Sequence, residues 1–151
     1  MYLCISFTCT FFENMILYEV KVRLSVFMRI LKSSEDYLES MLILSQKHGY
    51  IRSIDIAAML EVTKPSVSYA VKRLRENGYI LMEKDGHITL TEAGLAIAER
   101  VYERHTLLTD FLVALGVSEK TAREDACKIE HDLSDETFDA MKKHAQKYSA
   151  R

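Results

Sequence analysis

Three side chains near the end of the sequence could together bind a metal ion. Cys127, Glu130 and His131 are spaced i, i+3 and i+4, so on a helix they would project from one face. A thiolate, a carboxylate and an imidazole on one face form a ligand set for a divalent transition metal. Taken alone, a cysteine is more often a small buried hydrophobe, and a Glu-His pair can be polar surface. The metal prediction therefore depends on what else the chain brings to that face.

Length, composition and charge limit what the chain can be. Its 151 residues suit one domain or two small subdomains with a shared core, and 48% of them are hydrophobic. A formal net charge of −2 argues against a generally basic nucleic-acid coat but allows a locally basic element. Three cysteines without a disulfide-like pattern suggest a reducing cytosol, and no apolar run reaches the length of a membrane span. We expect a cytoplasmic protein without a membrane partner.

The pattern of apolar residues and turn signals divides the chain into three parts and predicts a mainly α fold. Residues 1–31 lack sustained periodicity, so we predict an N-terminal extension outside the core; the alternative is an extra helix or strand on the domain surface. Residues 32–90 are predicted to form a winged helix-turn-helix DNA-binding domain. Residues 91–151 are predicted to form an all-helical metal-binding and dimerisation domain.

The winged helix-turn-helix prediction depends on helix boundary signals and one turn. Helices are predicted over about residues 33–48, over residues 54–60 and after Lys64-Pro65. The last two, separated by a tight turn, fit the helix-turn-helix pattern. Asp85-Gly86 then separates two β-like segments and favours a type I′ hairpin turn, which would be the wing. The boundary signals are Ser33 or Ser34, Gly49, Ser53, Pro65 and Gly78.

Three further helices are predicted after the wing. Thr91 can cap a long amphipathic helix that ends at Leu115, Ser118 can cap the helix that carries Cys127, and Ser134 can cap the last one. Three helices in about 60 residues close a core of their own with difficulty. Their wide apolar faces therefore predict a homodimer interface.

The second helix of the helix-turn-helix has a face suited to DNA. Small hydroxyl side chains allow close approach to the major groove, and basic side chains can neutralise phosphates. Residues 91–151 have a net charge of −3, so positive charge is concentrated in the first domain. The alternative is a winged helix used for protein contact. The predicted DNA-binding residues are Lys64, Pro65, Ser66, Ser68, Tyr69, Lys72 and Arg73, with Lys84 in the wing.

Several segments, taken together, resemble a known family. These segments are Ser34-Glu35-Asp36-Tyr37-Leu38-Glu39, Pro65-Ser66-Val67-Ser68, Leu90-Thr91-Glu92-Ala93-Gly94, Arg104-His105 and Cys127-Lys128-Ile129-Glu130-His131. Their order is similar to that in metal-dependent repressors of the diphtheria toxin repressor and manganese transport regulator type. The resemblance covers about residues 33–148. It implies a transcriptional repressor, not an enzyme, whose corepressor is a divalent cation.

The resemblance also implies a metal-ligand set that is a hybrid of two branches. Asp36 and Glu39 match manganese-type ligands, whereas Cys127 matches an iron-type ligand where manganese regulators have a carboxylate. Singly, Asp36 could instead close a capping box with Ser33, Glu39 could be a plain exposed residue and His105 could be a core histidine. We predict one well-formed site for Mn²⁺ or Fe²⁺, with Zn²⁺, Co²⁺ or Ni²⁺ also compatible. The implied ligands are Asp36, Glu39, His105, Cys127, Glu130 and His131.

The hypothesis is that the metal links the first helix to the dimerisation helices. The homodimer would then hold its two winged helices at a spacing that fits a palindromic operator. Repression of genes for metal-ion homeostasis is the implied role. One alternative is a winged-helix regulator that answers to an organic ligand or to an oxidant through Cys127. A second alternative, a metalloenzyme, lacks any recognisable nucleophile arrangement or phosphate loop in the sequence.

Overall fold

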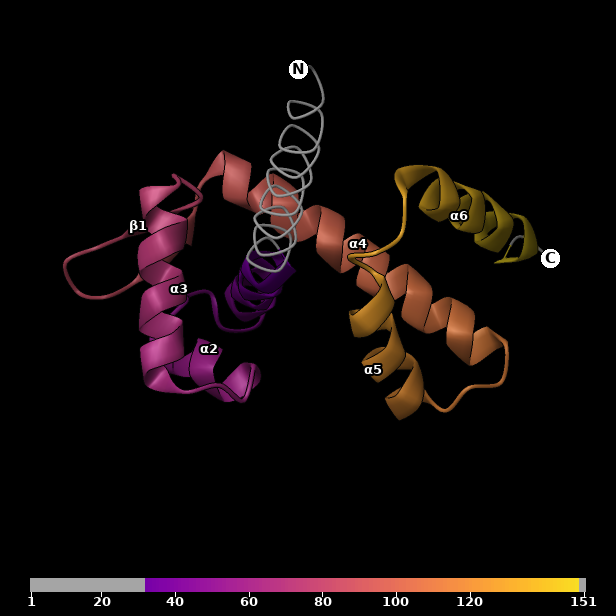
Figure 1. The fold of residues 1–151 in the computed structure, drawn as a ribbon, viewed down its shortest axis with the longest axis horizontal. Helices are drawn as coiled ribbons and strands as arrows, with labels where there is room; N and C mark the ends of the chain where they lie inside the picture. The colour runs from indigo at the N-terminus through magenta and orange to yellow at the C-terminus, as the bar shows by residue number, and fades with distance from the viewer. Residues whose placement is uncertain (1–31, 150–151) are drawn as a thin grey trace, which may run out of the picture. The chain divides into compact units, whose positions relative to one another are not determined.

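The structure is a computed structural model that describes residues 32–149, so the predicted extension over residues 1–31 lies outside the described residues. Residues 32–48 are helical and are called the first helix below. Short helices, a hairpin and three further helices follow it (Figure 1). In chain order these are α2 (Ser53–Met59), α3 (Lys64–Glu76), β1 (Ile80–Met82), β2 (Ile88–Leu90), α4 (Glu92–Ala114), α5 (Glu119–Ile129) and α6 (Asp135–Ser149).

The first helix, α2, α3 and the hairpin share one apolar core, which confirms the predicted winged helix-turn-helix. Helix α3 packs on α2 and on β1, and the start of α4 packs on β2. Burial of this much apolar surface stabilises short helices that would be marginal in isolation. The most buried members of the core are Leu38, Met41, Ile56, Val67, Leu74, Ile80, Ile88 and Ala98.

The wing is an antiparallel pair in which Ile80 faces Leu90 and Met82 faces Ile88. The predicted type I′ turn is wrong, because that turn needs a positive φ at both central residues and only Gly86 of the Asp85-Gly86 pair has one, at 85°. Gly86 N–H instead donates to Glu83 O, and Glu83 N–H donates to His87 O. This pattern describes a three-residue loop that ends in a left-handed glycine.

Helix starts agree with the sequence in some places and differ in others. The Thr91 side chain accepts a hydrogen bond from Gly94 N–H, and Ser118 accepts one from Thr121 N–H, as predicted. Ser53 does not cap α2; it is the first helical residue, and Arg52 precedes it without a side-chain cap. The N-cap of α3 was not predicted: it is Thr63, whose side chain accepts a hydrogen bond from Ser66 N–H.

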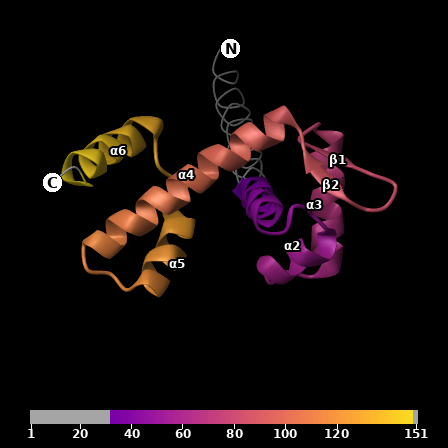
Figure 2. The same ribbon diagram turned by 180° about the vertical axis from the view of Figure 1, so that it is seen from behind.

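Helix α4 belongs to both halves of this arrangement. Its start contacts β2, and its remainder contacts α5 and α6, as the reverse view shows (Figure 2). Arg104 on α4 is buried, and it donates hydrogen bonds to the carbonyls of Glu130 and Leu133 and pairs with Asp135. Because the Arg104 side chain bonds two carbonyl groups of the turn between α5 and α6, it fixes the orientation of that turn on α4.

None of the helices within residues 32–149 is both long and apolar enough to cross a lipid bilayer.

Candidate metal centre

Two parts of the chain that are about ninety residues apart in sequence meet at one polar cluster. The first helix brings Asp36 and Glu39, which lie less than one turn apart. Helix α4 brings His105, and the end of α5 brings Glu130 and His131. Carboxylate oxygens and imidazole nitrogens from these five residues fall into two groups, and within each group the candidate ligand atoms lie within 4.8 Å of one another.

The first group contains Asp36, Glu130 and His131. His131 Nε2 lies 2.8 Å from Asp36 Oδ1 and 3.4 Å from Glu130 Oε1. The side chain of Glu130 is fully buried and that of His131 is 6% exposed, so neither is freely solvated. One imidazole nitrogen thus faces two carboxylates from different elements.

The second group contains Glu39, His105 and Glu130. His105 Nδ1 lies 3.0 Å from Glu130 Oε2 and 3.8 Å from Glu39 Oε1. Glu130 therefore directs one oxygen toward each group. The sequence predicts one site, whereas the described geometry offers two candidate positions that share Glu130.

Two buried carboxylate oxygens in the cluster indicate that a cation fits there. Glu39 Oε1 and Glu130 Oε1 are inaccessible to solvent and have no hydrogen-bond partner among the described residues. A buried carboxylate oxygen without a partner is costly, and a coordinated divalent cation removes that cost. Oxygen and imidazole donors suit Mn²⁺ and Fe²⁺.

The excess of carboxylates over cations in the cluster makes its members hold protons more tightly than usual. Burial and the nearby Glu130 charge raise the pKa of Glu39 to about 7. Hydrogen bonds to Asp36 and Glu35 raise the pKa of His131 to about 10, so that its imidazole holds a proton at neutral pH. The hydrogen bond between His105 and Glu130 likewise raises the pKa of His105. Metal binding must displace these protons.

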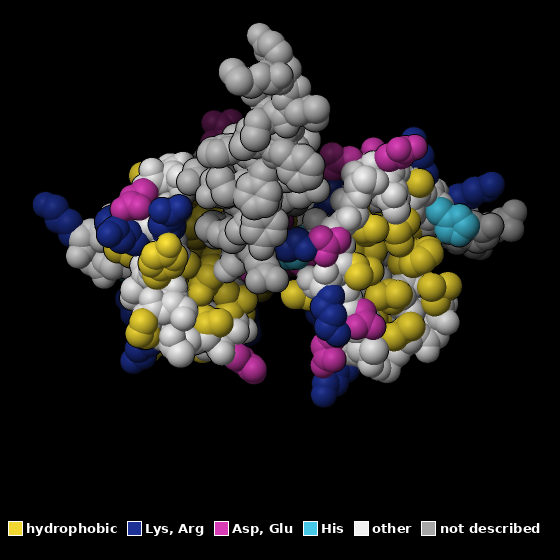
Figure 3. All heavy atoms as spheres, in the orientation of Figure 1, with side chains coloured by type: hydrophobic (Ala, Val, Ile, Leu, Met, Phe, Trp, Pro, Cys, Tyr) yellow, Lys and Arg dark blue, Asp and Glu magenta, His cyan; other side chains and the backbone are white. Residues whose placement is uncertain are grey.

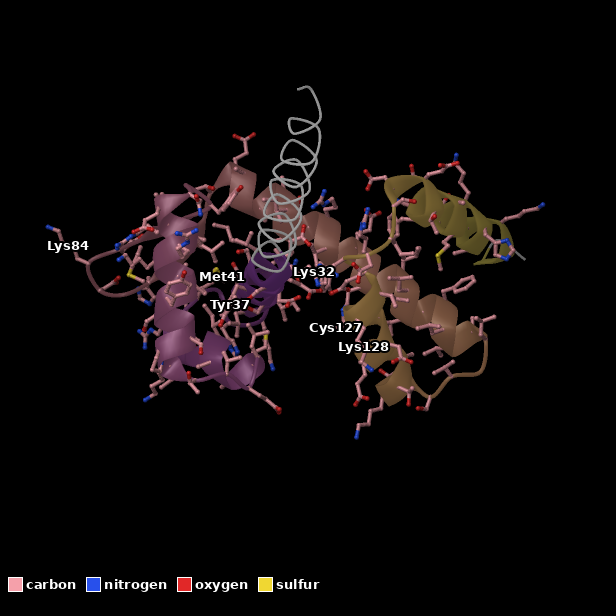
Figure 4. All side chains as sticks on the ribbon, viewed as in Figure 1. Lys32, Tyr37, Met41, Lys84, Cys127 and Lys128 are labelled. Atoms are coloured by element: carbon pink, nitrogen blue, oxygen red, sulfur yellow. The ribbon has the colours of Figure 1, made fainter. Side chains whose placement is uncertain are left out.

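Cys127 lies beside this cluster but belongs to neither candidate group. Cys127 and Glu130 remain three residues apart on helical backbone, because Glu130, the C-cap of α5, keeps helical dihedrals and its N–H donates to Ala126 O, whereas His131 lies in the turn that follows. That all three act together as ligands stays a prediction. Glu130 is buried. Cys127, labelled near the end of α5 in Figure 4, is exposed. Desolvation and the Glu130 charge raise the pKa of the Cys127 thiol to about 11, which disfavours the reactive thiolate that an oxidant sensor needs.

Glu35 is a member of the cluster that the sequence reading did not single out. Its Oε2 lies 2.7 Å from His131 Nδ1, and its Oε1 accepts a hydrogen bond of 2.8 Å from Arg100 on α4. The hydrogen bond from His131 lowers the pKa of Glu35. The sequence places Glu35 immediately before Asp36. It gives no indication that Glu35 contacts the Nδ1 side of the His131 ring.

The residues predicted to bind DNA are exposed on α3 and in the hairpin loop. All seven candidates on α3 are exposed, and Tyr69 is 66% exposed. Lys84 extends from the tip of the hairpin loop (Figure 4). The Ser66 hydroxyl already shares a hydrogen bond with Thr63, since it lies 2.8 Å from Thr63 Oγ1. Those on α3 are Lys64, Pro65, Ser66, Ser68, Tyr69, Lys72 and Arg73.

Comparison with known proteins places both halves of the chain in one group of proteins. Residues 29–88 match a family model described as the iron-dependent repressor N-terminal DNA-binding domain. Residues 91–149 match one described as the iron-dependent repressor metal-binding and dimerisation domain. An uncharacterised HTH-type transcriptional regulator of Methanocaldococcus jannaschii is 38% identical over 78% of this chain and 95% of its own length.

Proteins that carry the name of a metal regulator are similar to a comparable degree. The transcriptional regulator MntR of Escherichia coli O157:H7 is 39% identical over 78% of this chain and 76% of its own length. The solved structure of the manganese regulator SloR is 31% identical, with a TM-score of 0.68 over 75% of this chain. That of T. acidophilum IdeR is 26% identical, with a TM-score of 0.66 over 74% of this chain. The chain spans 53% of each of these two solved chains.

Proposed function

The chain belongs to the family of iron-dependent repressors, and on that premise we propose that it is a metal-responsive transcriptional repressor that binds DNA as a homodimer. The family consists of transcriptional regulators, not enzymes. The proposed corepressor is a divalent cation, Mn²⁺ or Fe²⁺, and the proposed targets are genes for metal-ion homeostasis. A palindromic operator fits a dimer that presents two winged helices.

The observation that supports this proposal is the cluster around Glu39 Oε1 and Glu130 Oε1, two buried oxygens that have no hydrogen-bond partner among the described residues. The cluster joins a helix of the DNA-binding half to α4 and to the end of α5. A bound divalent cation would supply the positive charge that these carboxylates lack. The proposed ligands are Asp36, Glu39, His105, Glu130 and His131. Cys127, whose sulfur is in neither group of converging atoms, is proposed as a further ligand that would influence metal preference.

The proposed mechanism is a population shift. Without metal, the first helix is joined to α4 and to the end of α5 by the contacts of Glu35 and Asp36 with Arg100 and His131, while Glu39 and Glu130 repel each other. The two halves of each subunit can then adopt other relative arrangements. When the repulsion is offset, these residues hold the first helix against α4 and α5. Metal must bind this arrangement more tightly than the others for repression to respond to it. We infer that this arrangement sets the spacing of the two winged helices in the dimer.

The test is binding of fluorescent palindromic duplexes, followed by anisotropy, with Mn²⁺, with anaerobic Fe²⁺, with Zn²⁺ and with chelator. We expect Glu130→Ala and His131→Ala to weaken metal-dependent DNA binding at least 100-fold, and Cys127→Ala to act mainly on the order of metal preference. Lys120→Ala, an exposed charge on α5, is the control and should bind as the unchanged protein does. Full metal-dependent affinity in both Glu130→Ala and His131→Ala would refute the site.

The DNA surface is tested separately by the salt dependence of binding. Lys72 is exposed on α3 and makes only a long contact of 3.9 Å with Glu76, so it is available to a phosphate. We expect Lys72→Ala to weaken binding to all sequences alike and to reduce the slope of log affinity against log salt by about 1. An unchanged slope would remove Lys72 from the interface.

A further inference from the structure

His131 is held from both sides by carboxylates, and only one side belongs to a candidate metal group. Its Nε2 faces Asp36 and Glu130, whereas its Nδ1 faces Glu35 at 2.7 Å. Glu35 is a member of neither group. A histidine that coordinates through one ring nitrogen must carry its proton on the other, and a carboxylate that accepts that proton fixes the tautomer and the ring orientation.

Glu35 is itself fixed by a second element. Arg100 on α4 donates to the Glu35 oxygen that His131 does not use. Each oxygen of the carboxylate therefore has one partner, and the group cannot rotate toward the metal groups without losing both. The side chains become less exposed along this series, from Arg100 at 55% through Glu35 at 20% to His131 at 6%. Arg100, Glu35 and His131 thus form a series of contacts that leads from the solvent to the buried side of the cluster.

We propose that Glu35, held by Arg100, is a positioning residue that presents His131 Nε2 to the metal. This inference rests on the proposed function, since it assigns a role beside the proposed site. Glu35 does not coordinate the cation; it fixes His131 with the proton on Nδ1 and the lone pair of Nε2 directed at Asp36 and Glu130. Arg100 is on α4 and Glu35 is on the first helix. The orientation of the His131 ring therefore depends on how the first helix packs against α4.

The first experiment measures Mn²⁺ affinity by competition with a fluorescent chelator in the full chain without DNA. Glu35→Ala should bind Mn²⁺ about 10–100-fold more weakly, which is the usual loss when the carboxylate partner of a metal-binding histidine is removed. Glu35→Gln keeps the side-chain volume, so its Mn²⁺ affinity should lie between those of Glu35→Ala and the unchanged protein. Arg100→Gln should lose less than Glu35→Ala. The matched control is Glu119→Ala, which breaks an exposed Arg–Glu pair on α5 that lies outside the cluster.

The second experiment reads the His131 tautomer, which a merely structural role of Glu35 would not change. With diamagnetic Zn²⁺ bound, long-range ¹H–¹⁵N spectra should show His131 protonated on Nδ1 and coordinated through Nε2. In Glu35→Ala the spectra should show a mixture of tautomers or coordination through either nitrogen. Circular dichroism of each variant without metal reports whether it is folded, and Glu35→Gln serves if Glu35→Ala does not fold.

The outcomes separate this inference from the proposed function. If the unchanged protein does not bind Mn²⁺, or if Glu130→Ala binds it equally well, the proposed site fails and this inference fails with it. If Glu130→Ala loses binding while both Glu35 variants bind within twofold of the unchanged protein, the positioning role alone is overturned. A loss in Glu35→Ala as complete as that in Glu130→Ala would make Glu35 a ligand and would also overturn it.

Discussion

At the scale of single residues, Glu39 shows what the cluster costs the metal-free chain in stability. Its carboxyl has a pKa of about 7 in the folded chain, against an ordinary value of 4.5. Between these two pH values the unfolded chain has released this proton while the folded chain keeps it, so stability is lost as pH rises from 4.5 to 7 and the penalty stays constant above 7. The metal-free protein therefore carries this loss of stability in full above pH 7.

Glu39→Gln should remove this cost. We expect it to raise the free energy of unfolding of the metal-free protein by about 1–3 kcal/mol at pH 8 and by much less at pH 5. Urea denaturation in the presence of chelator at both pH values measures the difference. Glu119→Gln, at an exposed position, should show no comparable pH dependence. A Glu39→Gln variant that is less stable at pH 8 would contradict the raised pKa.

The candidate ligands illustrate how far residue-level prediction reaches. Asp36, Glu39, His105, Glu130 and His131 were named from the resemblance, and the structure brings all five together, although their role as ligands stays a prediction. Cys127 was named both from the resemblance and from its spacing to Glu130 and His131, but its sulfur belongs to neither group of converging ligand atoms, so its role as a ligand also stays a prediction. The helix end at Ile129 is set by tertiary contacts, including the bond from Arg104 to Glu130 O, which local spacing does not encode.

At the scale of elements, the junction between the wing and α4 tolerates no extra atoms. Thr91 N–H donates to Tyr79 O, Thr91 Oγ1 donates to Gly78 O, and Gly94 then packs directly on Tyr79. A Cβ on Gly94 would lie 2.0 Å from Tyr79 O, a backbone atom that cannot move aside like a flexible side chain. Close approach of α4 to the hairpin therefore requires glycine at this position.

Gly94→Ala should be strongly destabilising although alanine favours helices. We expect a loss of about 3 kcal/mol, because overpacking against backbone forces α4 away from the hairpin. Ala96→Gly, at an exposed position on the same helix, should cost only about 0.5–1 kcal/mol. Thermal and urea denaturation of the two variants decide the matter. A Gly94→Ala variant that is as stable as Ala96→Gly would show that α4 can shift without penalty.

Among the elements, those with strong local signals were predicted and those with tertiary causes were not. Thr91 and Ser118 cap their helices as expected because Ser and Thr satisfy free N–H groups locally. The Asp85-Gly86 pair predicted a hairpin correctly and its turn type wrongly. The strands are only three residues long, and the additional bridge between Ile51 and Ile88 comes from a residue between the first helix and α2 that no local pattern connects to the wing.

At the scale of the whole molecule, the C-terminal helices leave apolar surface uncovered in one chain. Figure 3 shows a broad apolar area on the side of α4, α5 and α6. Val113 is 42% exposed and Leu115 is 67% exposed at the end of α4, and Ile129 is 39% exposed at the end of α5. Surface of this kind is costly in water and is usually covered by a partner. A second copy of the chain is the partner that the match to a dimerisation domain favours.

The double variant Val113→Asp/Leu115→Asp tests this interface. Carboxylates introduced at a buried contact would have to lose their hydration, so we expect the dimer dissociation constant to rise at least about 100-fold. Sedimentation velocity with Mn²⁺ should show monomers at micromolar concentration, and affinity for a palindromic duplex should fall accordingly. Mn²⁺ binding should persist, since neither residue belongs to the metal groups. Ile54→Asp, an equally exposed apolar position on α2, should remain dimeric; a dimeric double variant would place the interface elsewhere.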